Sequence, residues 1–133
     1  MYRERLMRAN RAAALPHELC ECLTNVLGAD AAKVRIVEHS WFAWLHAGAH
    51  ATTRRGCIYL RGSASEFFGD HELVLHEYFH VLHQWETDEL SVWRYLLESF
   101  RRGYWDNRFE IAAREFATDN VHRFRALLSQ QRF

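Results

Sequence analysis

Apolar residues recur at helical spacing in two parts of the chain. The first part lies between Pro16, which suits the first turn of a helix, and Gly28, which suits its end. Its apolar face comprises Leu19, Leu23, Val26 and Leu27. The second part begins near Asn107, and its apolar face comprises Phe109, Ala112, Ala113, Phe116 and Ala117. Both patterns predict helices that pack one face against a core.

Other segments favour helices through their end signals or propensity. Residues 72–85 contain no Gly or Pro, and Asp70 is a candidate N-cap for a helix there. Residues 90–102 predict a helix that stops at Gly103. Residues 2–14 favour a helix by propensity, and we interpret their arginines as a solvated helix face.

Short alternating runs predict a small sheet. Residues 34–38 alternate as a half-buried strand does, and residues 51–60 predict two strands that turn near Gly56. Ser40 can cap a short aromatic helix from Trp41 to Ala47 that ends at Gly48. The Gly and Ser residues of segment 61–69 predict a loop. We therefore expect an α+β fold that is mainly helical.

Composition places the chain among folded globular proteins. Of its 133 residues, 49% are hydrophobic and 14% aromatic, which suits one domain covering residues 1–133. The formal net charge of zero argues against nucleic acid or an anionic membrane as partner. No apolar run is long enough to cross a bilayer, and the Arg-rich start lacks the apolar stretch of a signal peptide. We expect a soluble protein, cytoplasmic when made, with Cys20, Cys22 and Cys57 as free thiols.

Residues 76–80 read HEYFH and match the pattern H-E-x-x-H. On a helix, residues four apart lie about 40° apart around the axis and roughly 6 Å along it, so His76 and His80 could bind one zinc ion. Glu77 would flank the ion, where its carboxylate can take a proton from an attacking water. The alternative is an amphipathic core helix in which the histidines form hydrogen bonds and Glu77 faces solvent. Because the chain has nine His, the pattern alone can arise by chance.

A catalytic zinc ion usually takes three protein ligands, so a third is required. Glu110 is the best candidate, because the small alanines around it would let its helix approach the H-E-x-x-H helix. Its rival is Glu115, about 140° further around the helix, and both cannot face one ion. The alternative for Glu110 is an exposed carboxylate favoured by the helix dipole.

The remaining histidines are weaker ligand candidates. His83 falls on the face of His76 and His80, but it lies roughly 10 Å along the axis from His76, so the three rings would converge poorly. The others have no recognisable ligand spacing: His39, His46, His50 and His71.

Two histidines and a downstream glutamate on a second helix resemble the gluzincin arrangement of zinc peptidases. More closely, residues 15–117 resemble the small metallopeptidase-like core domain of bacterial extracellular contractile-injection-system and related proteins. The shared segments are the Leu-Pro-led helix, Val34-Arg35-Ile36, residues 51–59, residues 75–81 with Gln84 after them, and Asn107-x-x-Glu110-x-x-Ala113.

This resemblance implies a zincin-like fold and a zinc-dependent peptidase. It makes Glu110 the third zinc ligand beside His76 and His80, with Glu77 as the general base. It also implies a protein or peptide substrate and a place in a larger secretion or injection assembly, with export that needs no signal peptide.

The zincin arrangement holds an extended substrate along an edge strand of the sheet by main-chain hydrogen bonds. Residues 57–60 are the candidate edge strand, with an ordinary core strand as the alternative. Tyr104 and His83 are candidates, on position alone, for stabilising the oxyanion.

Two positions depart from the family pattern. His83 stands where the family commonly has Gln, and Arg114 stands where several related peptidases have an Asp or Asn that orients a ligand histidine. An arginine cannot accept such a hydrogen bond, so the orienting group is not identified by the sequence. The second hypothesis is therefore a catalytically idle zincin-like binding or structural module. A nucleic-acid binder is a weak third, because the net charge is zero.

Overall fold

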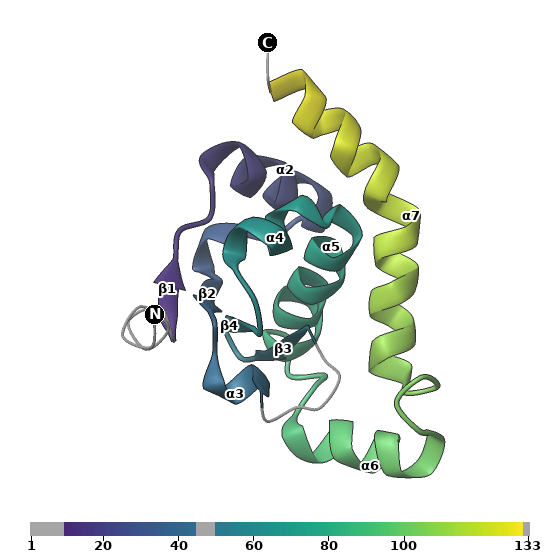
Figure 1. The fold of residues 1–133 in the computed structure, drawn as a ribbon. Helices are drawn as coiled ribbons and strands as arrows, with labels where there is room; N and C mark the ends of the chain where they lie inside the picture. Colours follow the sequence, from purple (N-terminus) through teal and green to yellow (C-terminus); the bar gives the residue numbers. More distant parts are fainter. Residues whose placement is uncertain (1–9, 45–49, 132–133) are drawn as a thin grey trace.

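The computed structural model describes residues 10–44 and 50–131 (Figure 1). In chain order its elements are β1 (Arg11–Ala13), α2 (His17–Leu27), the 3₁₀ helix η1 (Ala31–Lys33), β2 (Arg35–Glu38), α3 (Trp41–Trp44), β3 (Ala51–Arg54), β4 (Cys57–Leu60), α4 (Ala64–Gly69), α5 (His71–Phe79), the π-helix η2 (His80–Trp85), α6 (Val92–Arg102) and α7 (Arg108–Gln131). Helices predominate beside one small sheet, so the predicted α+β class with mainly helical content is confirmed.

The four strands of the described sheet lie in the order β1-β2-β4-β3. β1 pairs antiparallel with β2, β2 pairs parallel with β4, and β4 pairs antiparallel with β3. The prediction that residues 57–60 form the edge strand is therefore wrong. These residues are β4, which is flanked on both sides, and its side chains Cys57, Ile58 and Leu60 are buried. The edge nearest the H-E-x-x-H segment is β3 instead.

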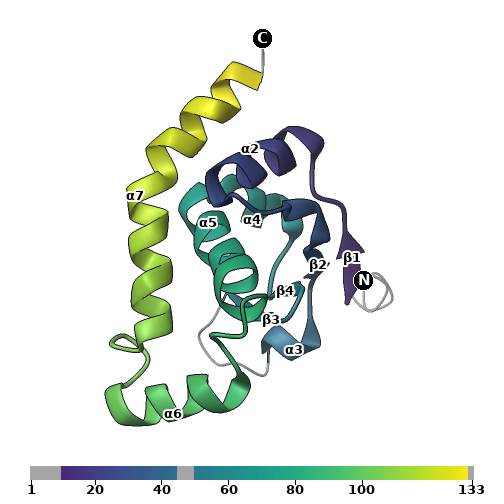
Figure 2. The same ribbon diagram turned by 180° about the vertical axis from the view of Figure 1, so that it is seen from behind.

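Helix α5 lies between the sheet and α7 in both ribbon views (Figures 1 and 2). Its buried residues Val74, Leu75 and Tyr78 join the main core. The inner strands contribute Ile36 and Ile58 to the same core. α2 and α7 close it with Leu19, Cys22, Leu23, Val26, Leu27, Ala117, Val121 and Phe124. The H-E-x-x-H segment is thus held on two sides by apolar packing.

The predicted helix ends are borne out by cap geometry. Gly28 ends α2 in the left-handed region at φ 68°, where a residue without a Cβ is favoured. The Asp70 carboxylate accepts the Leu73 N–H and caps α5. Ser40 Oγ accepts the N–H groups of the residues that open α3, while the predicted end of that helix at Gly48 lies outside the described residues.

Two predictions for secondary structure are wrong. Of segment 2–14, residues 1–9 lie outside the described part, and Arg11–Ala13 form strand β1 rather than a helix. Pairing with β2 outweighs the helix propensity of these residues. Segment 61–69 is not a loop throughout, because Ala64–Gly69 form α4, with Ser63 Oγ accepting the Glu66 N–H as its N-cap.

Helix α6, which the structure describes in full, buries no side chain. Trp93 and Phe100 are 82% and 90% exposed. The helix crosses the end of the molecule between η2 and α7 (Figure 1). In residues 10–44 and 50–131, no helix has the length and apolar character needed to cross a membrane. The three cysteines are free, as predicted.

Candidate metal centre

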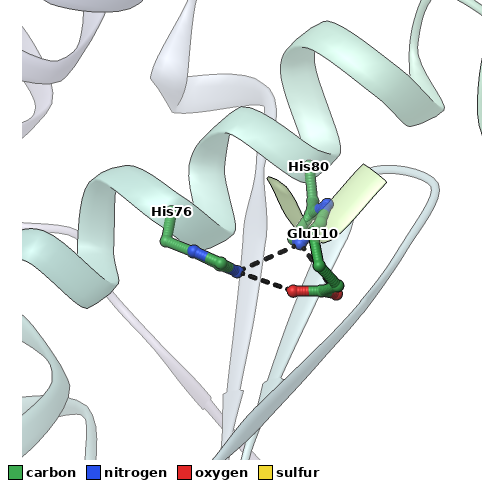
Figure 3. Close-up of side chains that lie close together, drawn as sticks. All are labelled: His76, His80 and Glu110. Atoms are coloured by element: carbon green, nitrogen blue, oxygen red, sulfur yellow. Dashed lines mark hydrogen bonds and ion pairs between the residues drawn. The ribbon is translucent and has the colours of Figure 1, made fainter. Parts of the chain in front are cut away.

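Three polar side chains meet where α5 passes into η2 and α7 begins (Figure 3). His76 Nε2 lies 3.0 Å from Glu110 Oε2, and His80 Nε2 lies 3.2 Å from Glu110 Oε1. The two ring nitrogens are 3.2 Å apart. His80 and Glu110 are buried and His76 is partly buried. The three residues predicted as metal ligands are therefore brought together, and they could hold a metal ion.

The spacing of these atoms suits a small divalent cation. Tetrahedral ligands at about 2.0–2.2 Å from a zinc ion are about 3.3–3.6 Å from one another. The two ring nitrogens are 3.2 Å apart, and they lie 3.0 and 3.2 Å from the two different oxygens of Glu110, separations slightly shorter than that range. Two imidazoles and a carboxylate are also a donor set that zinc accepts. Without a cation, at least one proton must lie between the two facing ring nitrogens.

Gln84 orients the ring of His80. The carbonyl oxygen of Phe109 can only accept, so the Gln84 amide nitrogen, 3.0 Å away, must donate to it. The Gln84 Oε1 then faces His80 Nδ1 at 2.6 Å and accepts its proton. This tautomer leaves the Nε2 lone pair of a neutral His80 free for a metal ion. Gln84 is the orienting group that Arg114 cannot provide.

Glu110 is held from two sides. The Tyr95 hydroxyl, on α6, donates to Glu110 Oε1 at 3.1 Å, while both histidines lie against the carboxylate. Burial alone would raise the pKa of Glu110, but the hydrogen bonds and charges of His76 and His80 hold it well below its usual range. Burial opposes charging of His80, yet Glu110 raises its pKa above that of a free imidazole. The carboxylate of Glu110 is therefore anionic and can bind a cation.

Glu77 is buried, with 7% of its surface exposed, but its carboxylate makes no hydrogen bond to any described residue. Burial raises its pKa, partly offset by the nearby histidines. Glu77 lines two cavities that meet beside the centre, one of about 390 Å³ and one of about 330 Å³. Its carboxylate is therefore available to a bound molecule and has the raised pKa that suits proton transfer.

The two cavities differ in character. The larger one is lined by polar side chains that include Asp70, Glu72 and Arg114. The smaller one has an apolar wall from η2, α6 and the connection between them, made by Trp85, Leu90, Val92 and Leu96. Edge strand β3 forms part of the smaller cavity, and Ala51 and Tyr104 line both. The two cavities are therefore neighbours that share Ala51, Glu77 and Tyr104 in their walls, and we call the pair the cleft, with a polar and an apolar end.

Tyr104, a candidate from the sequence for stabilising the oxyanion, lies near the centre. It borders both cavities beside Glu77. Partial burial and the negative charges of Glu110 and Glu77 raise its pKa to about 12, so its hydroxyl keeps its proton and can donate. The structure thus leaves Tyr104 as a candidate for stabilising negative charge on a bound molecule.

His83 does not share the face of the two ligand histidines, contrary to the sequence prediction. Residues 80–85 form a π-helix, in which each residue advances roughly 80° around the axis instead of about 100°. This turns His83 away from the centre, where its Nε2 contacts the Leu27 carbonyl at 2.7 Å and its ring packs on Phe79 and Phe116. His83 lines neither cavity, which excludes it as ligand and as oxyanion helper in this structure.

The other candidates lie apart from the centre. Glu115 is exposed on α7, so the choice of Glu110 over Glu115 agrees with the geometry. Of the two cavities beside the centre, His50 lines the polar one but not the apolar one, and His71 packs against Phe124. His39 lies near Glu38, outside the group of possible ligands, and His46 lies outside the described residues.

Sequence reasoning missed two residues of the centre. Gln84 was noticed only as part of a family pattern, although its spacing of four from His80 is a usable signal for a hydrogen bond. Tyr95 carries no such signal, because its contact with Glu110 depends on how α6 crosses to α7. Asn107, which also contacts α6, caps α7: its Oδ1 accepts the Phe109 N–H.

Comparisons of the chain with protein-family models, curated proteins and solved structures found no significant match in any of the three. The function of the chain is therefore inferred from its own geometry.

Proposed function

We propose that this chain is a zinc-dependent peptidase with a zincin-like arrangement, the function that its H-E-x-x-H helix and downstream Glu110 suggest. The single observation that carries the proposal is the set of separations of 3.0 to 3.2 Å among His76 Nε2, His80 Nε2 and the Glu110 oxygens. They fit one zinc ion, and Glu77 lies beside them with a free carboxylate facing the cleft.

The chemistry needs one contribution from the metal and several from the chain. When bound, zinc polarises a carbonyl and lowers the pKa of water. Glu77 takes the proton of the attacking water and then delivers it to the nitrogen of the leaving amine, so it starts and ends the reaction ionised. The raised pKa of Glu77 favours the first of these transfers, the uptake of the proton from water. The Tyr104 hydroxyl donates to the oxygen that gains negative charge.

Edge strand β3 offers a place for an extended peptide. The Arg61 N–H donates to the His50 carbonyl, which sets the alternation of the antiparallel pair. By that alternation, Thr52 and Arg54 direct their main-chain groups to β4, whereas Ala51 and Thr53 direct theirs outward. A substrate strand can pair with the outward groups of Ala51 and with the Thr53 N–H without a particular side chain, which suits a protein substrate.

The test compares wild type with Glu77→Gln, which removes the base but keeps the shape of the side chain. We expect both proteins to bind one zinc ion per chain, measured by metal analysis after reconstitution. Wild type should cleave an unfolded protein such as denatured casein, and Glu77→Gln should lose at least about 100-fold in rate. Stoichiometric zinc without cleavage by wild type would instead identify the zincin-like binding module. Absence of zinc after reconstitution would contradict both functions.

A further inference from the structure

Arg54, the last residue of edge strand β3, is a half-buried cation without an acidic partner among the described residues. Its guanidinium lies over the ring of Phe42, 4.8 Å from the centroid, and 5.9 Å from the centroid of Trp85. Burial lowers its pKa, and no carboxylate offsets that effect. Its neighbour Arg55 is exposed and forms an ion pair with Asp88. The two arginines therefore differ in burial and in partner.

The guanidinium has donors to spare. It carries five N–H groups, and only Nη1 has a hydrogen bond in the described residues, to the Thr53 carbonyl at 2.7 Å. Stacking against aromatic rings uses the face of the guanidinium and leaves its edge open. A planar fork with open donors matches the two oxygens of a carboxylate.

Arg54 lies at the apolar end of the cleft. Arg54 lines the cavity of about 330 Å³, which Glu77, His80 and Glu110 also line. The apolar wall of the same cavity can receive a hydrophobic side chain. Because Arg54 already binds the outward carbonyl of Thr53, main-chain pairing along β3 is interrupted there. A peptide lying on β3 thus meets a cation at the place where its main-chain contacts stop.

We propose that Arg54 binds a carboxylate of the substrate, next to a hydrophobic side chain in the apolar end of the cleft. The proposal rests on the proposed function in taking a peptide as the ligand. The carboxylate can be the C-terminus of the peptide or the side chain of Glu or Asp. Both sources present the same pair of oxygens to the guanidinium.

The experiment uses two pairs of short hydrophobic peptides. In the first pair the peptides differ only in a C-terminal carboxylate or carboxamide. In the second pair both are amidated and differ only in one internal Glu or Gln. Calorimetry measures binding to the full chain in two forms. The first is the metal-free chain, and the second is zinc-loaded Glu77→Gln, which binds peptides without cleaving them. Because neither measurement needs cleavage, the binding result can be interpreted even if the peptidase assay shows no activity.

We expect wild type to prefer the carboxylate member of at least one pair by about tenfold or more, a typical effect of a charge-assisted hydrogen bond. The pair that discriminates identifies the source of the carboxylate. Arg54→Gln should bind the carboxylate and neutral peptides equally. The matched control Arg55→Gln, which removes the same charge from an exposed neighbour, should keep the preference.

Equal binding within both pairs by wild type, or an undiminished preference in Arg54→Gln, would overturn the proposal. Loss of the preference in Arg55→Gln would also overturn it, because a general charge effect would then be the cause. If thermal melting shows that Arg54→Gln is unfolded, Arg54→Lys replaces it. Lysine keeps the charge but loses the planar fork, so a clear reduction of the preference is expected.

Discussion

Helices α6 and α7 both border the candidate metal centre, but they are held in place by different forces. α7 buries a continuous stripe at intervals of one, three and four residues: Phe109, Glu110, Ala113, Ala117, Val121 and Phe124. Two of these are alanines, which let α7 lie close to α5, as the ribbon views show (Figures 1 and 2). α6 buries no side chain.

α6 is held mainly by polar contacts, beside one apolar contact in which Tyr95 packs against the cluster of Trp85, Leu90 and Phe109. The Tyr95 hydroxyl reaches Glu110, and Asn107 Nδ2 donates to Ser99 Oγ at 2.9 Å and approaches the Tyr95 carbonyl at 3.3 Å. Hydrophobic packing places Glu110 with little freedom, whereas hydrogen bonds set the position of the cleft wall that α6 provides. Glu110 and the cavity wall beside it, although neighbours, are therefore held mainly by different interactions.

Truncation of one phenylalanine on each helix tests this difference most strongly. Phe124 on α7 is 0% exposed, so Phe124→Ala should lower the free energy of unfolding by about 3–5 kcal/mol. Phe100 on α6 is 90% exposed, so Phe100→Ala should change it by less than about 0.5 kcal/mol. Urea unfolding of the metal-free chain measures both. Equal losses would show that α6 packs as firmly as α7.

Replacement of the two glutamates on α7 tests the ligand itself. Glu110→Ala should weaken zinc binding by at least about 100-fold, because it removes one of three ligands. Glu115→Ala should leave the affinity unchanged, because that side chain is exposed on the other side of the helix. Competition with a zinc-binding dye gives both affinities. The reverse order would mean that the wrong face of α7 was assigned to the metal.

The hydrogen bonds around the ligands should have smaller effects. Gln84→Leu removes the group that orients His80 and links it to α7, so zinc affinity should fall about 10–100-fold. Tyr95→Phe removes only the hydrogen bond from α6 to Glu110 and should cost less, about tenfold or under. A larger loss in Tyr95→Phe than in Gln84→Leu would give α6 the main positioning role.

The pH dependence of zinc binding should follow the titration of His80. Glu110 raises the pKa of His80 despite the opposing effect of burial, so the metal-free chain keeps this proton to a higher pH than a free imidazole would. A metal ion must displace that proton, so the apparent affinity should rise with pH and level off above the raised pKa. Calorimetry in buffers of different ionisation enthalpy measures the proton release. Binding at neutral pH without proton release would contradict the assignment.

Local signals allowed much of this fold and centre to be predicted from the sequence. Pro16, Gly28 and Asp70 mark helix ends through their own backbone or side-chain chemistry, and the spacing of His76 and His80 follows from helix geometry. Glu110 could be chosen because the alanines around it permit close packing.

Features that depend on pairing between distant segments were missed. β4 has the composition of either an edge or a core strand, and only its pairing with β2 decides between them. Arg11–Ala13 favour a helix by propensity but pair with β2. The π-helix is invisible to hydrophobic periodicity, because six residues with wider turns look the same in sequence as six residues of an α-helix.

The π-helix at His80–Trp85 has a consequence for how this chain tolerates changes in length. A π turn holds one residue more than the α turn it replaces, so it has the form of a single-residue insertion absorbed inside a helix. Deletion of Leu82 would convert the segment to an α-helix and shift Gln84 and Trp85 by one position relative to His80. His76 and His80 precede the deletion and would keep their places. The extra residue therefore sets where Gln84 and Trp85 lie relative to His76 and His80.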